Sequence, residues 1–319
     1  MSKQAKSKQV KFKQAKVVVV GSSNTDMVVK SQRIPAPGET VIGGEFVLAA
    51  GGKGANQAVA AARLGAKVTF VAKVGSDMFG YQAVAGYQKE GINTKFIFRD
   101  TQHATGVALI LVDAKGENLI SVASGANEFL TPADIEQAES AIAAANVVVT
   151  QLETPLDVLA CTAKLAKKHG VPLILDPAPA PDEPLPIEIL RDVACIKPNE
   201  NETERLTGIK VTDPASALKA AGHLLELGVQ AAIITLGSNG CLVVEKPGEG
   251  LHIEGYRVEV VDTTAAGDAF SGALACGIGE GYTLTESARL ATAASAYSVT
   301  RLGAQPSLPT LREVVMFAK

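Results

Sequence analysis

The spacing of apolar residues predicts that strands and helices alternate along most of the chain. The first apolar run, VVVVG at 17–21, is short and β-branched and ends in glycine, as buried strands often do. An alanine-rich helical segment follows a glycine loop at 51–66 and ends at Gly65. Further strands are predicted at 68–75, 146–152, 171–176, 193–200 and 231–237, and further helices at 77–90, 132–145, 155–169 and 214–227. This order predicts an α/β fold, a doubly wound and mostly parallel sheet with helices on both faces.

Two segments interrupt the alternation with strand pairs that have two different faces. One lies at about 27–50, and the other lies at about 96–124, where TGVALILVD and LISVASG are joined by the turn-forming AKGEN. They predict a small β-sheet beside the main sheet. We interpret it as a lid over a site, and a dimerising sheet is compatible with the same pattern. The expected organisation is one domain at 17–319 with these lid strands, preceded by an extension at 1–16.

Composition excludes several classes of protein. The chain has 319 residues, 47% of them hydrophobic, and a formal net charge of −3, which excludes disorder as the main state. Aromatic residues at 4% argue against a base-stacking surface, and no apolar run reaches the roughly 18 residues of a membrane helix. The four cysteines and four histidines are scattered, so a zinc site is not expected. We therefore expect a cytoplasmic protein that binds neither nucleic acid nor membrane.

The first sixteen residues differ from the rest in charge. They hold six lysines and no acidic residue. The segment lacks the apolar stretch of a secretory signal, and we interpret it as a solvated extension. A nucleic-acid-binding arm and an organelle address remain open alternatives.

Polar residues gather where the predicted strands end. GSSNTD, QLE, DPAPA, KPNE and TLGSNG each follow an apolar strand. Ligands of open α/β sheets bind at the carboxyl ends of strands, so these segments predict one cleft. Simple turns would explain the glycines and prolines but not the recurring Asn, Asp and Glu.

The most informative segment is VDTTAAGDAFSGALACGIG at 261–279. Ala265, Ala266 and Gly267 are small residues at a predicted helix start, where backbone N–H groups can converge on an anion. Asp268 follows directly, as suits a base that accepts a hydroxyl proton beside a bound phosphoryl group. We expect the helix N-terminus to keep Asp268 ionised at pH 7. The alternative is an acidic residue that only favours the helix start.

Two further segments offer groups for a small polar ligand. GGKGAN at 51–56 is neither a Walker A nor a GxGxxG motif, but its glycines permit close approach and Lys53 and Asn56 offer donors. GSSNTD places Asn24 and Asp26 two residues apart, an amide and a carboxylate suited to adjacent sugar hydroxyls. On these six residues alone, an Asx-turn is the favoured interpretation.

Two more segments suit a nucleotide. KPNENE holds Asn199 and Glu202, which can organise the water shell of Mg²⁺, and helix capping by Asn199 is compatible with that role. TLGSNG at 235–240 offers hydroxyls and N–H groups for a phosphate or a ribose. A tight turn into the next strand is the alternative.

Together, GGKGANQAVAA, DPAPA, PNENE, TLGSNG and DTTAAGDAFSGAL resemble the ribokinase-like (PfkB) sugar kinases over about residues 17–312. GGKGAN preceded by GSxNxD is similar to the ribokinase branch of that family. The resemblance implies ATP-dependent phosphorylation of the 5-hydroxyl of D-ribose, giving D-ribose 5-phosphate and ADP. It also implies that Asp268 is the general base, with an anion hole at the amides of Ala265, Ala266 and Gly267.

The resemblance further implies the ligands' contacts, two cations and a homodimer formed through the lid sheets. The implied sugar contacts are Asn24, Thr25, Asp26, Gly52, Lys53, Gly54, Ala55, Asn56, Glu153 and Asp268. The implied nucleotide contacts are Asn199, Thr235, Leu236, Gly237, Ser238, Asn239, Gly240 and Gly267. Mg²⁺ is expected to be bound through water at Asn199 and Glu202, and K⁺ at Asp262, Thr264, Ser298, Arg301, Gly303 and Ser307. Thr292 departs from the Asn or His that relatives often have near the adenine.

Other functions remain as alternatives. The acceptor sugar could be another furanose, such as deoxyribose, fructose or a nucleoside, because one residue can change how a hydroxyl fits. A non-catalytic sugar sensor would be expected to have lost Asp268 or the AAG segment, and both are intact. A nicotinamide-dependent dehydrogenase would need GxGxxG after the first strand, where GSSNTD stands instead.

Overall fold

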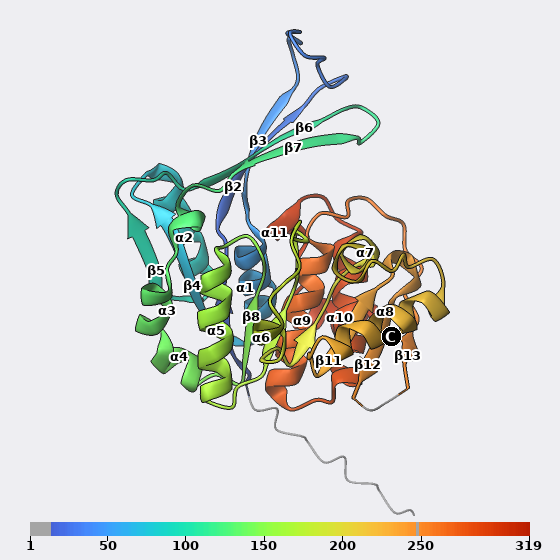
Figure 1. The fold of residues 1–319 in the computed structure, drawn as a ribbon. Helices are drawn as coiled ribbons and strands as arrows, with labels where there is room; N and C mark the ends of the chain where they lie inside the picture. Colours follow the sequence, from blue (N-terminus) through green and yellow to red (C-terminus); the bar gives the residue numbers. More distant parts are fainter. Residues whose placement is uncertain (1–13, 247–248) are drawn as a thin grey trace, which may run out of the picture.

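A computed structural model describes residues 14–246 and 249–319, which contain a nine-stranded sheet and a separate four-stranded sheet (Figure 1). The large sheet has the order β13-β12-β11-β10-β9-β8-β1-β4-β5. Its strands pair in parallel from β5 to β11, and β12 and β13 add an antiparallel edge. Their bounds are β1 Lys16–Val20, β4 Lys67–Gly75, β5 Asn93–Asp100, β8 Val147–Thr150, β9 Leu173–Leu175, β10 Cys195–Ile196, β11 Ala231–Thr235, β12 Cys241–Glu245 and β13 Leu251–Ile253. The predicted α/β class and mostly parallel sheet are confirmed.

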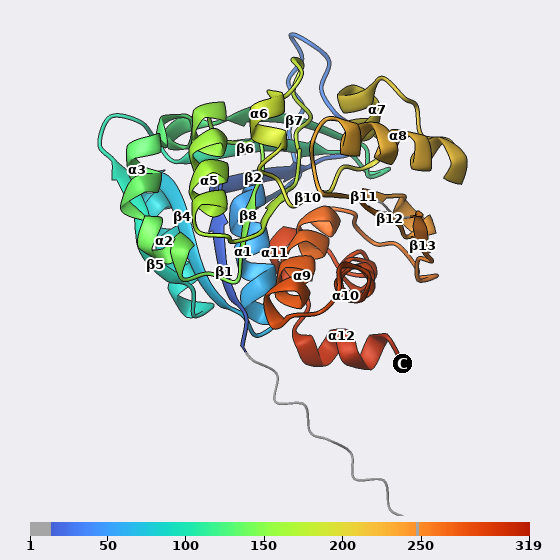
Figure 2. The same ribbon diagram turned by 60° about the horizontal axis from the view of Figure 1, so that its bottom comes forward.

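Helices cover both faces of the large sheet because its strands are apolar on both faces. In β1, Val17 and Val19 belong to one core cluster, and Val18 and Val20 belong to the other. The first face packs against α1 Lys53–Arg63, α2 Met78–Lys89, α9 Ala266–Glu280, α10 Leu284–Ser298 and α12 Leu311–Phe317. The second packs against α3 Pro132–Gln137, α4 Glu139–Ala143, α5 Leu156–Lys168, α6 Ile187–Leu190 and α8 Pro214–Glu226 (Figure 2).

The small sheet extends away from this body, as Figure 1 shows. Its order is β3-β2-β6-β7, with bounds β2 Asn24–Lys30, β3 Glu45–Gly51, β6 Gly106–Val112 and β7 Asn118–Ala123. The lid segment expected at 96–124 is therefore shorter, because residues up to Asp100 form β5 at the edge of the large sheet. Of the extension expected at 1–16, residues 1–13 lie outside the described residues, and Lys16 already belongs to β1.

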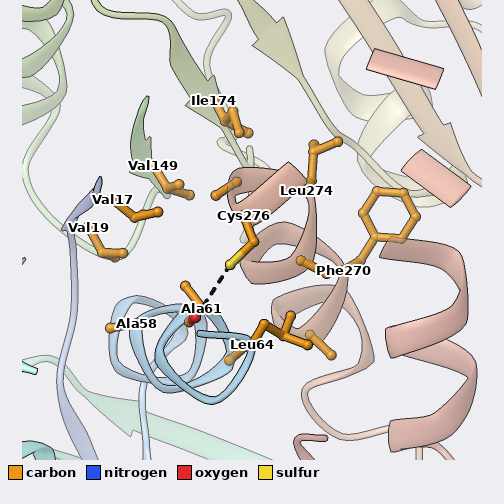
Figure 3. Packing of buried hydrophobic residues seen from close by; sticks show 14 of the residues in the cluster. Val17, Val19, Ala58, Ala61, Leu64, Val149, Ile174, Phe270, Leu274 and Cys276 are labelled. Atoms are coloured by element: carbon orange, nitrogen blue, oxygen red, sulfur yellow. Dashed lines mark hydrogen bonds between the residues drawn. The ribbon is translucent and has the colours of Figure 1, made fainter. Parts of the chain in front are cut away.

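Helices α1 and α9 pack unusually closely (Figure 3). A Cβ atom added at Gly272 of α9 would lie 2.6 Å from Ala60 Cβ and 2.9 Å from the carbonyl oxygen of Gln57. Farther along, the Cys276 thiol donates a hydrogen bond to the Ala61 carbonyl at 3.3 Å. Small residues at this contact let the two backbones approach, which places the start of α1 beside the start of α9.

Some elements differ from the prediction. The helix expected at 132–145 is divided into α3 and α4 at Ala138. Around Ala138 the backbone forms tight turns in which hydrogen bonds span three residues. The remaining helices, α7 Glu200–Thr207 and α11 Ala304–Ser307, and the 3₁₀ turns at Gly125–Phe129 and Gly237–Asn239 join longer elements. Across the described part of the chain, we find no helix both long enough and apolar enough to span a bilayer.

Candidate active site

The five polar segments predicted to form one cleft follow five consecutive strands of the large sheet, β1, β8, β9, β10 and β11. A cavity of about 610 Å³ opens at these strand ends. Its walls come from Asp176 after β9, Lys197 and Asn199 after β10, Thr235 of β11 and the start of α9. The segments after β9, β10 and β11 thus meet at one cavity, as predicted, whereas no residue of GSSNTD or QLE lines it.

The start of α9 is a tight turn at the cavity wall. Ala265 has φ 60° and ψ 11°, and it is the one non-glycine residue with positive φ in 14–246 and 249–319. The Ala266 N–H donates to the Thr263 carbonyl at 3.2 Å, so this amide already has an acceptor. Among the described residues, none accepts a hydrogen bond from the N–H of Ala265 or Gly267. Two of the three predicted anion-hole amides are therefore unpaired.

Asp268 is 5% exposed and is held by two amides of α1. Asn56 Nδ2 donates to one carboxylate oxygen at 2.9 Å, and Gln57 Nε2 donates to the other at 3.1 Å. Burial raises the pKa of Asp268 to about 6, against the opposing attraction of Lys53, and Asp176 raises it further. The helix N-terminus was expected to favour the charged form, but burial dominates. A pKa of about 6 still leaves most of the carboxyl ionised at pH 7.

Two more carboxylates lie on the side of Asp268 that faces the small sheet. Burial raises the pKa of Asp26 in β2 to about 6, and the negative charges of Glu153 and Asp268 add to the shift. Glu153 accepts hydrogen bonds from Ser22 Oγ at 2.5 Å and from the Lys53 N–H at 3.0 Å. Burial lowers the pKa of Lys53, but Asp268 and the other nearby carboxylates outweigh it and raise that pKa. The group is a compact set of hydrogen-bond acceptors around one cation.

The glycine loop before α1 shapes this side of the site. Gly52 is the N-cap of α1 with φ 89°, and a Cβ there would lie 2.7 Å from the Asn24 backbone nitrogen. The N–H groups of Gly54 and Ala55 donate to Ser22 Oγ and to the Ser22 carbonyl, at 3.3 and 2.9 Å. These two predicted sugar contacts therefore already have partners in the loop itself.

Asn24 and Thr25 line a cavity other than the large one. Asn24 Oδ1 accepts from Asn127 Nδ2 at 2.7 Å. Asn24 and Thr25 line a second cavity of about 150 Å³, together with Tyr87 of α2 and Gln305 of α11. The structure thus brings Asp26, Lys53, Asn56, Glu153 and Asp268 together, with Asn24 at the margin.

Asn199 and Glu202 form the predicted helix cap at the start of α7. Asn199 Oδ1 accepts from the Glu202 N–H at 2.8 Å, and Glu202 Oε2 accepts from the Asn199 N–H at 2.9 Å. Glu202 also lines the large cavity, and burial raises the pKa of its carboxyl. Its second oxygen, Oε1, accepts no hydrogen bond from a described residue, which fits contact with a water of a hydrated Mg²⁺. Where the structure describes the chain, no cluster of three or more His, Cys, Asp or Glu could hold a metal by itself.

The far end of the cavity is formed by Thr235, Gly237, Ser238 and Gly240, as predicted for nucleotide contacts, whereas Leu236 and Asn239 do not line it. Thr292 of α10 also lines it, but its hydroxyl donates to the Ala288 carbonyl at 2.8 Å. That hydroxyl is thus used within its own helix.

The predicted cation loop is a separate cluster beside the cavity. Asp262 Oδ1 accepts from the N–H and hydroxyl of Thr264 at 2.9 and 2.6 Å, and Oδ2 accepts from the Gly303 N–H at 2.8 Å. The Arg301 side chain turns away and pairs with Glu313 at 3.3 Å. Ser298 and Ser307 are buried and donate to carbonyls of their own turns. Carboxylate, hydroxyl and carbonyl oxygens are a donor set that suits a hard cation.

Comparison with known proteins agrees with this geometry. The profile of the "pfkB family carbohydrate kinase" matches residues 14–311. The chain belongs to the pfkB family of carbohydrate kinases.

Several of its relatives within the pfkB family are named as kinases of pentoses. The chain is 44% identical over 301 residues to a ribokinase of Haemophilus influenzae, covering 94% of this chain and 97% of the relative. It is 36% identical over 297 residues to a deoxyribokinase of Salmonella typhi, and the match covers 93% of this chain and 96% of the relative. It also matches the structure of Arabidopsis thaliana ribokinase complexed with ribose and ATP, with a TM-score of 0.89, 33% identity and coverage of 96% and 99%.

A buried group of polar side chains that the sequence did not predict lies behind this pfkB-family site. Gln57 donates to both Asp268 and Asp176, and Gln151 Nε2 donates to Gln57 Oε1 at 2.7 Å. Asp176 also receives a hydrogen bond from the Ser271 hydroxyl at 3.0 Å. Asp176 and Lys197 stand in DPAPA and KPNE, segments identified as strand ends without a role for either residue. The one sequence feature that could have indicated a role for Gln57 is its position directly after GGKGAN.

Proposed function

We propose that this protein phosphorylates the 5-hydroxyl of D-ribose with ATP, giving D-ribose 5-phosphate and ADP, within a kinase domain at 17–319. The observation that carries the proposal is the position of Asp268. It is buried at the junction between a cavity large enough for a nucleotide and a group of carboxylates suited to sugar hydroxyls. The ribokinase relatives, at up to 44% identity and nearly full coverage, support this choice of substrates.

The chemical step requires a base and a set of donors in one place. The 5-oxygen of ribose forms a bond to the γ-phosphorus as the bond between that phosphorus and the β,γ-bridging oxygen breaks, leaving its electron pair on ADP. The hydroxyl proton passes to the carboxylate of Asp268, which burial has made a stronger base. The free N–H groups of Ala265 and Gly267 stabilise the charge on the phosphoryl oxygens.

The sugar lies between the body and the small sheet in this proposal. Asp26 reaches the site from β2, and Lys53, Asn56 and Glu153 reach it from the body. Burial and the charges of Glu153 and Asp268 raise the pKa of Asp26; hydroxyl groups of a bound ribose donate to its carboxylate and so stabilise its charged form. The small sheet acts as a lid that excludes water during transfer.

Two cations complete the proposal. Asn199 and Glu202 hold Mg²⁺ through its water shell, and Mg²⁺ supplies neutralising charge on the nucleotide phosphates when bound. Asp262, Thr264 and the carbonyl oxygens of the 298–307 loop hold K⁺. The cation loop adjoins Thr263, which lines the cavity, so an ordered loop supports the start of α9.

A homodimer formed through the small sheets is part of the same proposal. Strand register places Phe46, Val29, Leu111 and Leu119 in one row across the sheet. Leu48, Met27 and Leu109 form the neighbouring row, on the face opposite Asp26. Phe46, Leu48, Leu109 and Leu119 are 59%, 48%, 55% and 53% exposed, an apolar surface that a second copy would cover.

The cysteines support a cytoplasmic location within this proposal. All four are free, and Cys195, Cys241 and Cys276 are buried. Thiols persist unpaired in a reducing compartment.

The test is ADP release with purified protein and a panel of acceptors: ribose, deoxyribose, fructose and a nucleoside, each with and without K⁺. We expect the highest kcat/KM with ribose and a stimulation by K⁺. A higher kcat/KM with another sugar would make that sugar, and not ribose, the substrate. Sugar binding without ADP release would indicate a sensor. No sugar-dependent release combined with NAD(H)-dependent absorbance change would overturn the kinase assignment.

A further inference from the structure

A buried ion pair lies in the wall of the large cavity, beside the start of α9. Lys197 follows β10 and Asp176 follows the neighbouring strand β9, so the sheet places them side by side. Lys197 Nζ is 3.1 Å from Asp176 Oδ1, and the side chains are 4% and 2% exposed. Both residues line the cavity.

The two partners differ in how completely they are bonded. Asp176 Oδ2 is held by Gln57 Nε2 at 2.9 Å and by Ser271 Oγ at 3.0 Å. Among the described residues, none donates a hydrogen bond of good geometry to Asp176 Oδ1, so its contact with Lys197 at 3.1 Å is an ion pair. In the part of the chain that is described, no residue accepts a hydrogen bond from Lys197 Nζ. A buried ammonium group is strongly destabilised unless its charge and its N–H groups are compensated. Lys197 has the Asp176 carboxylate at 3.1 Å and the Phe270 ring at 6.0 Å, and it lines the cavity, where its remaining N–H groups can meet a ligand.

The ammonium group also lies at the end of α9 that carries the unpaired amides. A Cβ added at Gly267 would be 3.4 Å from Lys197 Nζ, so the lysine lies over the first turn of that helix. The positive end of the helix, free N–H groups and a buried cation converge on one point. That combination selects a multiply charged oxyanion.

We propose that Lys197 binds a non-bridging oxygen of the γ-phosphoryl group, and that Asp176, fixed by Gln57 and Ser271, positions it. This inference rests on the proposed kinase activity. Lys197 donates hydrogen bonds and transfers no proton; the proton of the sugar hydroxyl still passes to Asp268. Asp176 is a positioning residue, because it contacts Lys197 and the α1 and α9 side chains rather than the phosphate. The Gln57 amide then links the base, Asp268, with Asp176, the ion-pair partner of Lys197.

The test uses double variants, because removing Lys197 alone would leave Asp176 as an uncompensated buried charge. The variant Lys197→Met with Asp176→Asn removes both charges and keeps the side-chain sizes. Its matched control is Lys73→Met with Asp134→Asn, which removes another largely buried ion pair, at 2.7 Å and 14% and 11% exposed, away from the cavity. For each protein we would measure kcat and the KM for ribose, and the Kd of ATP and ADP by calorimetry.

We expect the Lys197 double variant to lose roughly 10²-fold in kcat, as when one oxyanion-hole donor is removed, with little change in the KM for ribose. ATP should bind about tenfold more weakly and ADP unchanged, because only ATP carries the third phosphate. Equal kcat and ATP affinity in the two double variants would overturn the proposal. So would equal weakening of ATP and ADP, which would indicate a structural role.

If the Lys197 double variant does not fold, the wild-type protein provides the measurement. The ¹⁵N resonance of the Lys197 ammonium group should shift when a non-hydrolysable ATP analogue is added and remain in place with ADP. The same response to both nucleotides would refute the contact. If the wild type phosphorylates no sugar, the proposed function fails, while the calorimetry still decides whether Lys197 contacts the third phosphate.

Discussion

The contact between α1 and α9 and the small sheet are built in opposite ways. At the helix contact the backbones touch, and a single added methyl group at Gly272 would have no space. In the small sheet, by contrast, Phe46, Leu109 and Leu119 are more than half exposed. Asp268 and its two amide donors belong to the first region, whereas Asp26 belongs to the second. The groups proposed to carry out phosphoryl transfer are therefore fixed by packing, and a group proposed to contact the sugar is carried on an element with few packing constraints.

The largest expected effect comes from the closely packed side. Replacement Asp268→Asn removes the base while the amide keeps the shape of the carboxylate. We expect kcat to fall roughly 10²–10⁴-fold, with ATP and ribose still bound, because a general base contributes about that factor. Steady-state kinetics and calorimetry would measure this. A variant within a few-fold of the parent in kcat would show that Asp268 is not the base.

The same replacement should stabilise the fold. Since the pKa of Asp268 is about 6 when folded and ordinarily 3.8, the stability that its protonated form contributes is lost as the pH rises through that interval. The ionised carboxyl therefore costs on the order of 3 kcal/mol above pH 7. Urea unfolding of Asp268→Asn should show a gain of that order at pH 8 and about half of it at pH 5. A gain that does not change with pH would contradict the burial argument.

A smaller effect is expected where the two helices touch. Gly272→Ala would place a methyl group within 2.9 Å of the Ala61 nitrogen, so we expect a loss of about 1–3 kcal/mol in the free energy of unfolding. Gly222→Ala, in α8, meets nothing within 4 Å and serves as the control, with a gain of up to about 1 kcal/mol. Gly272→Ala should also lower kcat, because Asn56 and Gln57 move with α1. Equal behaviour of the two variants would show that the contact between α1 and α9 at Gly272 is not tight.

The smallest effect on stability is expected in the small sheet. Leu109→Glu combined with Leu119→Glu should change the free energy of unfolding by about 0.5 kcal/mol or less per exposed site. It should nonetheless convert a dimer into monomers, as sedimentation would show. Leu218→Glu, an equally exposed leucine of α8 at 44%, is the control and should leave the dimer intact. A wild-type protein that sediments as a monomer would refute the proposed dimer.

Much of the architecture followed from local pattern. Apolar runs and the polar segments after them identified five strands that end at one edge, because strand direction alone brings such ends together, and the ends of β9, β10 and β11 line the cavity. The edge strand β5 was not predicted as a separate strand; its residues from Phe96 onward were included in the segment expected to form the small sheet, whereas they pair with β4 in the large sheet. Which edge accepts a strand is decided by packing of distant segments rather than by its own residues.

The candidate site was accessible to sequence only in part. Motif residues such as Asp268, Lys53 and Glu202 have recognisable neighbours in the chain. Gln57 and Asp176 stand in the motifs GGKGANQAVAA and DPAPA, but nothing in the sequence predicts that they meet, since they are 119 residues apart. The pKa of Asp268 was likewise inaccessible, because it depends on how deeply the finished fold buries the carboxyl. Depth of burial is a property of the whole molecule.

The left-handed backbone of Ala265 indicates when the turn at the start of α9 becomes ordered. An alanine in this conformation is disfavoured by roughly 1–2 kcal/mol, so surrounding structure must hold it there. The unpaired amides on either side of that bend are consequently oriented in the empty enzyme, before a nucleotide arrives. The turn proposed to bind phosphate is therefore formed once, when the chain folds, and does not have to form again at each turnover.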